Sequence, residues 1–214
     1  VMNLTGITEE REFVIKHIID SLSIIKCGKP VTDMLMGVDK EGRPASFRLI
    51  DIGTGAGMPG VILKIAFPEL SVVLFDSLKK RLSFLDEVIA ELSLKDITTL
   101  HGRAEDMGRD RIYREAFDLA VSRAVARLNV LSEYSLPFVK RDGLFISYKS
   151  GEIEEELTEA KNAIGILGGR VEGDIRFRLP DSDMERSLIY IRKIKSTPAS
   201  YPRKAGVPSK KPIM

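Results

Sequence analysis

The sequence predicts an α/β protein in which helices cover both faces of a mostly parallel, seven-stranded sheet. Two observations support this fold class. Apolar runs of strand length alternate with helical patterns between residues 47 and 167, and two further β-patterned runs follow them. The chain has 214 residues, of which 43% are hydrophobic, so one domain with a sizeable core is expected.

The alternation places strands at residues 47–52, 71–76, 96–100, 117–122 and 143–149. Helices are expected between them at 59–67, 78–92 and 128–140, with a short helical turn near 104–108 and a further helix at 152–167. A stretch of hairpin length separates the runs 170–179 and 187–194, so the terminal strand should be antiparallel. A dinucleotide-binding domain would repeat its β-α-β half here instead.

The two ends of the chain differ from this core. A helix should come first, with Thr8 as its N-cap and an apolar stripe from Phe13 to Ile25, and residues 28–30 should end it. Residues 195–214 contain four prolines and no acid, so we expect an irregular tail that packs through Tyr201 and Ile213. These boundaries give an N-terminal helix and loop (1–46), a core (47–195) and a basic, proline-rich tail (196–214).

Composition restricts the possible classes of function. The formal net charge is only +2, so a surface that binds nucleic acid would need local basic patches. Cys27 is the only cysteine, which excludes an internal disulfide and a cysteine-rich metal site and agrees with a reducing compartment. No signal peptide or bilayer-length apolar run is present. We therefore expect a cytoplasmic protein without a membrane or metal partner.

A glycine-rich turn follows the first expected strand. Gly53, Gly55 and Gly57 alternate there, and glycine permits positive φ and close approach of a ligand to the backbone. Asp76 ends the second strand, where an acid can bind ribose hydroxyls. Residues 55–60 match the dinucleotide pattern G-x-G-x-x-G, which keeps an NAD-dependent oxidoreductase open. The spacing of Asp51 and the three glycines is instead the form seen in S-adenosylmethionine (SAM) methyltransferases.

Several separated stretches together resemble one family. They are DIGTGAGMPG at 51–60, DSLKKRLSFL at 76–85, HGRAE at 101–105, VSRAVA at 121–126 with Lys149, NLT at 3–5, HIIDS at 17–21, YPRKAG at 201–206 and KKP at 210–212. They are similar to the bacterial small-subunit ribosomal RNA guanine-N7 methyltransferases, also called glucose-inhibited division protein B. Members of that family have additional helical residues before NLT, so we expect that part of the N-terminal segment is missing.

The resemblance implies a Rossmann-like, class I SAM-dependent methyltransferase fold, with SAM as cofactor. It assigns cofactor contacts to Gly53, Gly55, Gly57, Met58, Asp76, Ser77, Leu78, Ala104, Glu105 and Arg123. It also implies 16S rRNA or the small ribosomal subunit as partner, with a monomeric enzyme. Candidate RNA contacts are His17, Arg103, Lys149, Arg186 and the basic residues of the tail, Arg203, Lys204, Lys210 and Lys211.

The expected chemistry needs little from the protein beyond positioning. Guanine N7 has a free lone pair, so its attack on a sulfonium methyl group requires no general base. Arg123 is the residue that we expect to act on the reaction, by alignment and electrostatics. Structural interpretations stay open: Asp76 as a helix cap, Glu105 as a first-turn acid, Arg123 in a salt bridge, and His17 on the surface. A noncatalytic module for RNA binding or ribosome assembly also remains possible.

Overall fold

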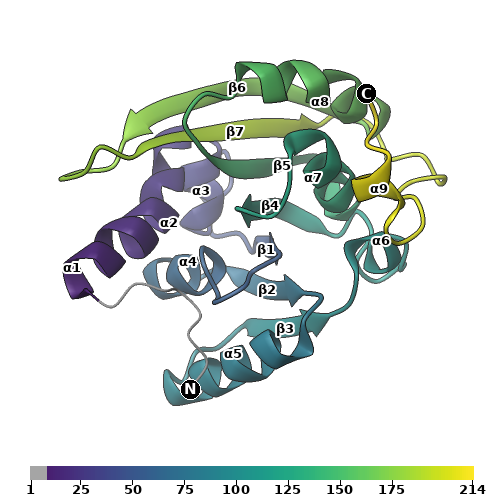
Figure 1. The fold of residues 1–214 in the computed structure, drawn as a ribbon. Coiled ribbons are helices and arrows are strands. Elements are labelled where there is room, and N and C mark those ends of the chain that lie inside the picture. The colour runs from purple at the N-terminus through teal and green to yellow at the C-terminus, as the bar shows by residue number, and fades with distance from the viewer. Residues whose placement is uncertain (1–8) are drawn as a thin grey trace.

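A seven-stranded sheet forms the centre of the molecule, in the order β3-β2-β1-β4-β5-β7-β6 (Figure 1). The computed structural model describes residues 9–214. The strands are β1 (Arg48–Ile52), β2 (Ser71–Asp76), β3 (Ile97–His101), β4 (Phe117–Arg123), β5 (Val139–Ser150), β6 (Gly169–Arg178) and β7 (Glu185–Lys193). The first five strands pair in parallel. The predicted sheet is therefore confirmed.

The antiparallel strand that was expected at the end of the chain is β7. It pairs antiparallel with β5 on one side and with β6 on the other, so β7 lies inside the sheet and β6 forms the edge. Strand order reverses between β1 and β4, which are neighbours although two strands separate them in sequence. In open α/β sheets, ligands bind beyond the carboxyl ends of the strands at such a reversal.

Helices cover both faces of the sheet, as predicted (Figure 1). The helices α4 (Gly60–Ala66) and α5 (Lys79–Glu91) contribute to one buried cluster, together with α3 (Val31–Leu35). The helices α7 (Leu128–Ser135) and α8 (Glu154–Ile166), with the short α6 (Ala104–Met107), contribute to a second cluster. Because both faces are covered, the central strands β1 and β4 are buried along almost their whole length.

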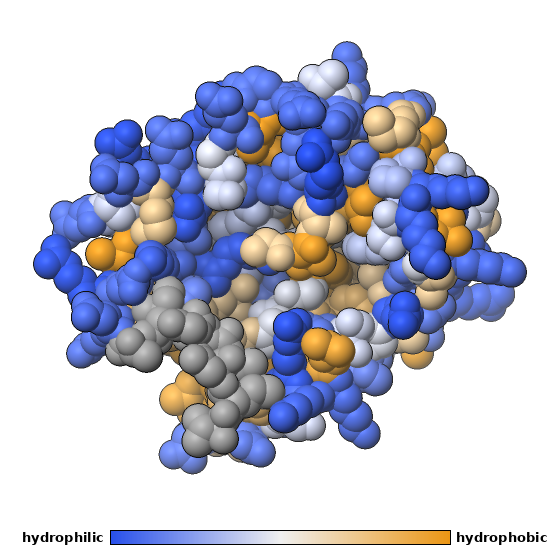
Figure 2. Space-filling model, in the orientation of Figure 1, coloured by the Kyte–Doolittle hydropathy of each residue, from blue (hydrophilic) through white to orange (hydrophobic). Residues whose placement is uncertain are grey.

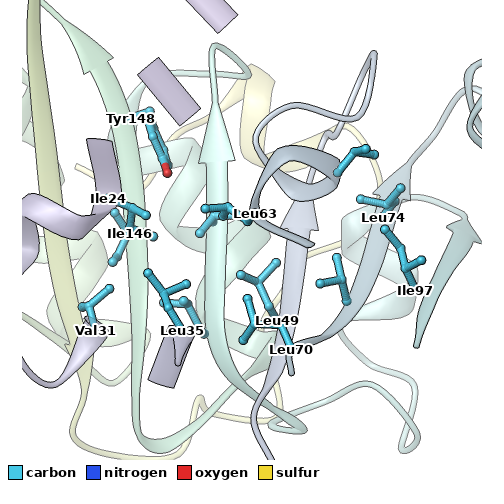
Figure 3. Close-up of a cluster of buried hydrophobic side chains, with 14 of the residues drawn as sticks. Ile24, Val31, Leu35, Leu49, Leu63, Leu70, Leu74, Ile97, Ile146 and Tyr148 are labelled. Carbon is cyan, nitrogen blue, oxygen red and sulfur yellow. The ribbon is translucent and has the colours of Figure 1, made fainter. Parts of the chain in front are cut away.

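The N-terminal segment belongs to the first cluster. Figure 3 shows side chains of this segment packed beside those of the sheet, among them Ile24, Val31, Leu35, Leu49 and Ile146. The segment is helical from residue 10 to residue 27, as the apolar stripe predicted, but it is not a regular α-helix throughout. It comprises α1 (Glu10–Phe13), a π-helical stretch (Val14–Ile19), α2 (Asp20–Leu22) and a 3₁₀ stretch (Ser23–Cys27). The proposed cap Thr8 and the motif at 3–5 lie outside the described residues.

Two other expectations about elements were wrong. The helix predicted over 128–140 ends at Ser135 and is followed by a 3₁₀ turn, Leu136–Phe138, because Pro137 lacks the N–H that an α-helix would need. Consequently β5 begins at Val139, four residues earlier than the expected 143. Helix α3 was also missed, since residues 31–35 are too few to show a helical period.

The tail after residue 195 is fastened to the domain. Arg114 donates hydrogen bonds to the carbonyl oxygens of Thr197 (2.6 Å) and Tyr201 (2.9 Å), and Arg109 donates to that of Pro202 (2.7 Å). Tyr201 packs against the second cluster, as expected. The tail includes one short helix, α9 (Val207–Lys210). Its backbone is therefore held by arginine side chains rather than by regular secondary structure.

Most of the face shown in Figure 2 is covered by hydrophilic residues, with small apolar patches between them. Within residues 9–214, no helix is long and apolar enough to span a bilayer. The same residues contain no group of three or more His, Cys, Asp or Glu that could hold a metal ion.

Candidate active site

A cleft of about 930 Å³ lies beyond the carboxyl ends of β1, β4 and β5. It occupies the place where strand order reverses, as the topology requires of a ligand site. The cleft brings together seven of the residues that the sequence singled out: His17, Gly53, Gly55, Met58, Arg123, Lys149 and Arg186. It also includes residues that the sequence analysis did not assign: Lys16, Asp20, Thr54, Ala56, Arg81, Ala124, Val125, Ala126, Arg127, Tyr148, Ser150 and Glu156.

The three alternating glycines all have positive φ, of 71° at Gly53, 58° at Gly55 and 89° at Gly57. A Cβ on Gly55 would meet only one atom within 4 Å, a backbone oxygen at 3.9 Å, so this backbone faces open space. A Cβ on Gly57 would lie 2.6 Å from Val61 Cγ2. Gly55 is therefore needed for open ligand space, whereas Gly57 permits close packing of the turn against helix α4.

Asp51 anchors the glycine turn from inside the protein. The side chain is fully buried, and its Oδ2 accepts hydrogen bonds from Thr54 Oγ1 (2.7 Å) and the Gly60 N–H (2.9 Å). Burial raises the pKa of Asp51 to about 6, although these two hydrogen bonds oppose the shift. Asp51 thus joins the end of β1 to the start of α4, and the turn between them keeps a fixed shape.

Asp76 holds the same turn from the neighbouring strand. Its Oδ2 accepts from the Gly55 N–H at 3.0 Å, and its Oδ1 accepts from the Leu78 N–H at 2.9 Å. The carboxylate, which is almost fully buried, also pairs with Arg81 at 3.3 Å. Each carboxylate oxygen can accept further hydrogen bonds. The open backbone at Gly55 and this acid at the next strand end together fit the ribose portion of a nucleoside cofactor.

Several residues that the resemblance assigned to the cofactor or to RNA lie outside the cleft wall. Arg103, Ala104 and Glu105 do not line the cleft, nor do Ser77 and Leu78. The Glu105 carboxylate is buried and accepts a hydrogen bond from the Gly206 N–H at 2.8 Å. Glu105 therefore ties helix α6 to the tail in this structure, and a cofactor role for it stays a prediction. Nothing in the sequence around Glu105 indicated that this acid would contact the tail, 101 residues further along the chain.

Arg123, at the end of β4, lies in a cluster of charges in the cleft wall. Its Nη1 donates to Asp20 Oδ2 at 3.2 Å, and Arg186 Nε donates to the same oxygen at 3.2 Å. Arg123 Nη2 lies 3.4 Å from His17 Nδ1. Burial and the neighbouring Arg123 lower the pKa of His17. The salt bridge that we considered as a structural role for Arg123 is thus present, and both of its residues line the cleft.

The loop 124–127 crosses the cleft floor between β4 and α7. Val125 packs over the glycine turn, since its Cγ2 would lie 2.6 Å from a Cβ on Gly53. Lys149 Nζ donates to the Ala126 carbonyl oxygen (2.6 Å) and pairs with Glu156 (2.6 Å). Lys149 therefore fixes this loop in place, a contact that the expected RNA role did not anticipate.

The four basic tail residues proposed for RNA binding divide into two groups. Lys204, Lys210 and Lys211 are exposed and form no ion pair within residues 9–214. Arg203 instead forms a two-pronged ion pair with the buried Glu133, with Nη2 2.6 Å from Oε2. The RNA role of Arg203 therefore stays a prediction, and no pattern in the sequence indicated that a buried acid on α7 would pair with its charge.

Comparison with known proteins agrees with this site. A family model described as "GidB: rRNA small subunit methyltransferase G" matches residues 1–177. The chain belongs to this family. Over its full length the chain is 52% identical to the ribosomal RNA small subunit methyltransferase G of Lachnoclostridium phytofermentans, and it spans 83% of that protein. Over 99% of its length it is 50% identical to the protein of the same name from Lactococcus lactis subsp. cremoris, spanning 84% of it.

Solved structures confirm the fold. A 16S rRNA (adenine(1408)-N(1))-methyltransferase from Catenulisporales acidiphilia is 14% identical, with a TM-score of 0.59 over 70% of this chain and 86% of that one. A putative sarcosine dimethylglycine methyltransferase from Galdieria sulphuraria is 11% identical, with a TM-score of 0.60 over 82% and 84% of the two chains. This member of the methyltransferase G family is thus a SAM-dependent methyltransferase with the class I fold.

Proposed function

We propose that this methyltransferase transfers the methyl group of SAM to N7 of a specific guanine in 16S rRNA, either in free rRNA or in the small ribosomal subunit. Its relatives are named for the small-subunit ribosomal RNA, which supports this substrate class. The observation that carries the proposal is the composition of the cleft. The glycine turn and the positively charged side chains of Lys16, Arg81, Arg123, Arg127, Lys149 and Arg186 line one continuous cavity.

The proposed cofactor portion of the cleft is its β1–β2 side. Gly53, Gly55 and Met58 line it, and Asp76, which does not itself line the cleft, accepts from the Gly55 N–H and keeps lone pairs for ribose hydroxyls. When bound, SAM supplies an electrophilic methyl group on a positively charged sulfur. The turn is held rigidly by Asp51 and Asp76, so it can orient this group without rearrangement. Six proposed cofactor residues do not line the cleft wall: Gly57, Asp76, Ser77, Leu78, Ala104 and Glu105.

The proposed RNA portion is the opposite side of the cleft and its rim. Arginine and lysine side chains there can contact phosphates, and Arg127 is the most open of the ion-paired cations that line the cleft, with 57% of its side chain exposed. Arg103 and the tail residues Lys204, Lys210 and Lys211 are exposed and extend the proposal beyond the cleft. Four of the proposed RNA-binding side chains already contact other residues of the chain: His17, Lys149, Arg186 and Arg203. Their contacts with RNA would be made in addition to these internal ones.

The reaction needs no proton removed from the attacking atom, because guanine N7 already carries a lone pair. The protein must bring this lone pair into line with the methyl group and stabilise positive charge as it moves onto the purine. Arg123 would keep its position through Asp20 and shape the field at the end of β4. An rRNA substrate of a bacterial enzyme also favours the cytoplasm, and we propose that the protein acts there as a monomer.

Methyl transfer to deproteinised small-subunit RNA and to intact small subunits tests the proposal. Isotopically labelled SAM would be the donor, and nucleoside mass spectrometry would identify the product. We expect one 7-methylguanosine per RNA, at a single position that primer extension after reductive cleavage can locate. Methylation of another atom, or of many unrelated guanines, would contradict the proposal. The Gly55→Ala variant is the matched control, because it should fold yet bind SAM poorly.

A further inference from the structure

Two buried polar atoms in the cleft wall have no hydrogen-bond partner among residues 9–214. They are His17 Nε2 and Asp20 Oδ1, which come from consecutive parts of the N-terminal segment. Both residues line the cleft, and Asp20 is only 3% exposed. A buried polar atom without a partner typically costs about 1–3 kcal/mol, so such atoms are rare in folded proteins. Two of them on side chains that line the same cleft indicate a site built for a ligand.

The hydrogen bonds of His17 Nδ1 and Asp20 Oδ2 show which of the two unpartnered atoms is a donor and which is an acceptor. The Arg123 guanidinium can only donate, so His17 Nδ1, 3.4 Å from Arg123 Nη2, is the acceptor. The proton of the neutral imidazole is then on Nε2. The lowered pKa of His17 favours that neutral form. On Asp20, Oδ2 accepts from Arg123 and from Arg186, which leaves Oδ1 as a vacant acceptor. The wall therefore presents one donor next to one acceptor.

We infer that His17 Nε2 and Asp20 Oδ1 recognise the target guanine, with His17 donating to O6 and Asp20 accepting from N1–H and N2–H. Guanine presents these groups in this order, beginning next to N7. Adenine presents an amino donor and then the N1 acceptor, so both of its contacts would be repulsive. The assignment rests on the proposed guanine-N7 methylation and adds the residues that select the base.

The same contact would assist the reaction. Methylation at N7 places positive charge on the purine and makes N1–H more acidic. A hydrogen bond from N1–H to a carboxylate therefore becomes stronger as the methyl group is transferred. Interactions that strengthen in the transition state raise the rate rather than only the affinity. A carboxylate also repels RNA phosphates, so the pair is poorly suited to bind the backbone.

The zwitterionic end of SAM also offers one donor and one acceptor, so the position of Asp20 along the sheet has to be compared with that of the ribose site. Asp76 ends β2, whereas Asp20 is paired with Arg123 on β4 and with Arg186 on β7. Strand β4 is two strands from β2, and β7 is four. At about 4.8 Å per strand, Asp20 lies roughly 10–19 Å along the sheet from the proposed ribose site. Asp20 therefore does not contact the ribose, and the SAM affinity of the Asp20 and His17 variants decides between the target base and the amino-acid end of SAM.

The test compares bases at the mapped target position. Small-subunit RNA would carry guanine or 2-aminopurine there, introduced by ligation; 2-aminopurine lacks O6 and has an acceptor at N1. We expect Asp20→Asn to lower single-turnover kcat/KM by about 100-fold or more on guanine and by less than about 3-fold on 2-aminopurine. His17→Ala should likewise lower kcat/KM only on guanine. This variant provides the test if Asp20→Asn does not fold. SAM affinity should stay within about 3-fold.

Arg186→Gln is the matched control. It removes an ion pair from Asp20 Oδ2 but leaves Oδ1 in place, so any loss should be equal for the two bases. The inference is overturned if Asp20→Asn and His17→Ala lose equal factors on guanine and 2-aminopurine, since the residues would then only support the fold. It is also overturned if their SAM affinity falls in proportion to the rate. Failure of the proposed function can be distinguished from failure of this inference, because in that case the wild-type enzyme would form no 7-methylguanosine.

Discussion

The side chain of Glu133 on helix α7, 1% exposed, accepts hydrogen bonds from both the backbone and the guanidinium of Arg203 in the tail. Oε1 lies 2.7 Å from the Arg203 backbone nitrogen, and Oε2 lies 2.6 Å from Nη2. This pair raises the pKa of the Arg203 guanidinium. A buried acid with such partners fixes the tail in one position, so the tail is part of the folded domain.

Replacing Arg203 should therefore destabilise the protein. Arg203→Ala leaves the buried Glu133 carboxylate without its charged partner, with only the backbone N–H of residue 203 still donating to it, and we expect a loss of about 3 kcal/mol in the free energy of unfolding. Arg203→Lys should lose less, because it keeps the charge but not the paired geometry. Lys204→Ala is the exposed control and should change stability by less than about 0.5 kcal/mol. Urea denaturation measures all three, and equal stability of Arg203→Ala and wild type would refute the structural role.

The exposed tail lysines should act on RNA binding instead. Substituting alanine at Lys204, Lys210 and Lys211 together should reduce the slope of log K against log salt by up to about 2–3, at roughly 0.7–0.9 for each phosphate that the tail no longer neutralises. SAM affinity and stability should stay unchanged. Filter binding to small-subunit RNA between low and high salt measures the slope. An unchanged slope would mean that the tail does not bind phosphate.

Gly55 should be required for the cofactor rather than for the fold. Its φ of 58° and the open space around it mean that Gly55→Ala adds a methyl group towards the cleft without meeting protein atoms. We expect about 1 kcal/mol of lost stability and at least about tenfold weaker SAM binding. Gly42→Ala has comparable strain, with φ of 78° and nothing within 4 Å, but lies in a distant loop. Calorimetric titration should find that Gly42→Ala keeps the SAM affinity of the wild type. Equal losses of SAM affinity in the two variants would rule out a cofactor role for the glycine turn.

The raised pKa of Asp51 makes stability depend on pH in a predictable direction. Its pKa is about 6 in the folded protein and 3.8 in the reference state, so the folded protein binds more protons between these values. The contribution of Asp51 is thus fully present below about pH 3.8 and is lost as pH rises through about 6.

Asp51→Asn isolates this contribution, because asparagine resembles the protonated acid and does not titrate. Relative to wild type, the variant should gain about 3 kcal/mol between pH 4 and pH 7, from a shift of roughly two pKa units. Denaturation of both proteins over this pH range gives the difference, in which all other titrating groups cancel. A difference that is constant with pH would show that Asp51 titrates normally.

The sequence by itself determined the strand positions, the glycine turn and the fold class. These features depend on local patterns: apolar runs set the strands, and alternating glycines after β1 permit the positive φ that the turn adopts. The family motifs at 51–60 and 121–126 likewise indicated the cofactor and the class of enzyme. The resemblance also found His17 and Arg186, which meet in the cleft although 169 residues separate them in sequence.

Only the tertiary structure decided the partners of the charged side chains. Glu133 and Arg203 are 70 residues apart, Glu105 and Gly206 are 101 apart, and Arg123 and Asp20 are 103 apart. No local pattern specifies such pairs, because each depends on which elements the sheet order places side by side. The same holds for the start of β5 and for the π-helical stretch with His17, where packing overrode the helical period of the sequence. The glycine turn and the family motifs thus indicated that a site existed, and folding determined which charged side chains are paired and which stay exposed.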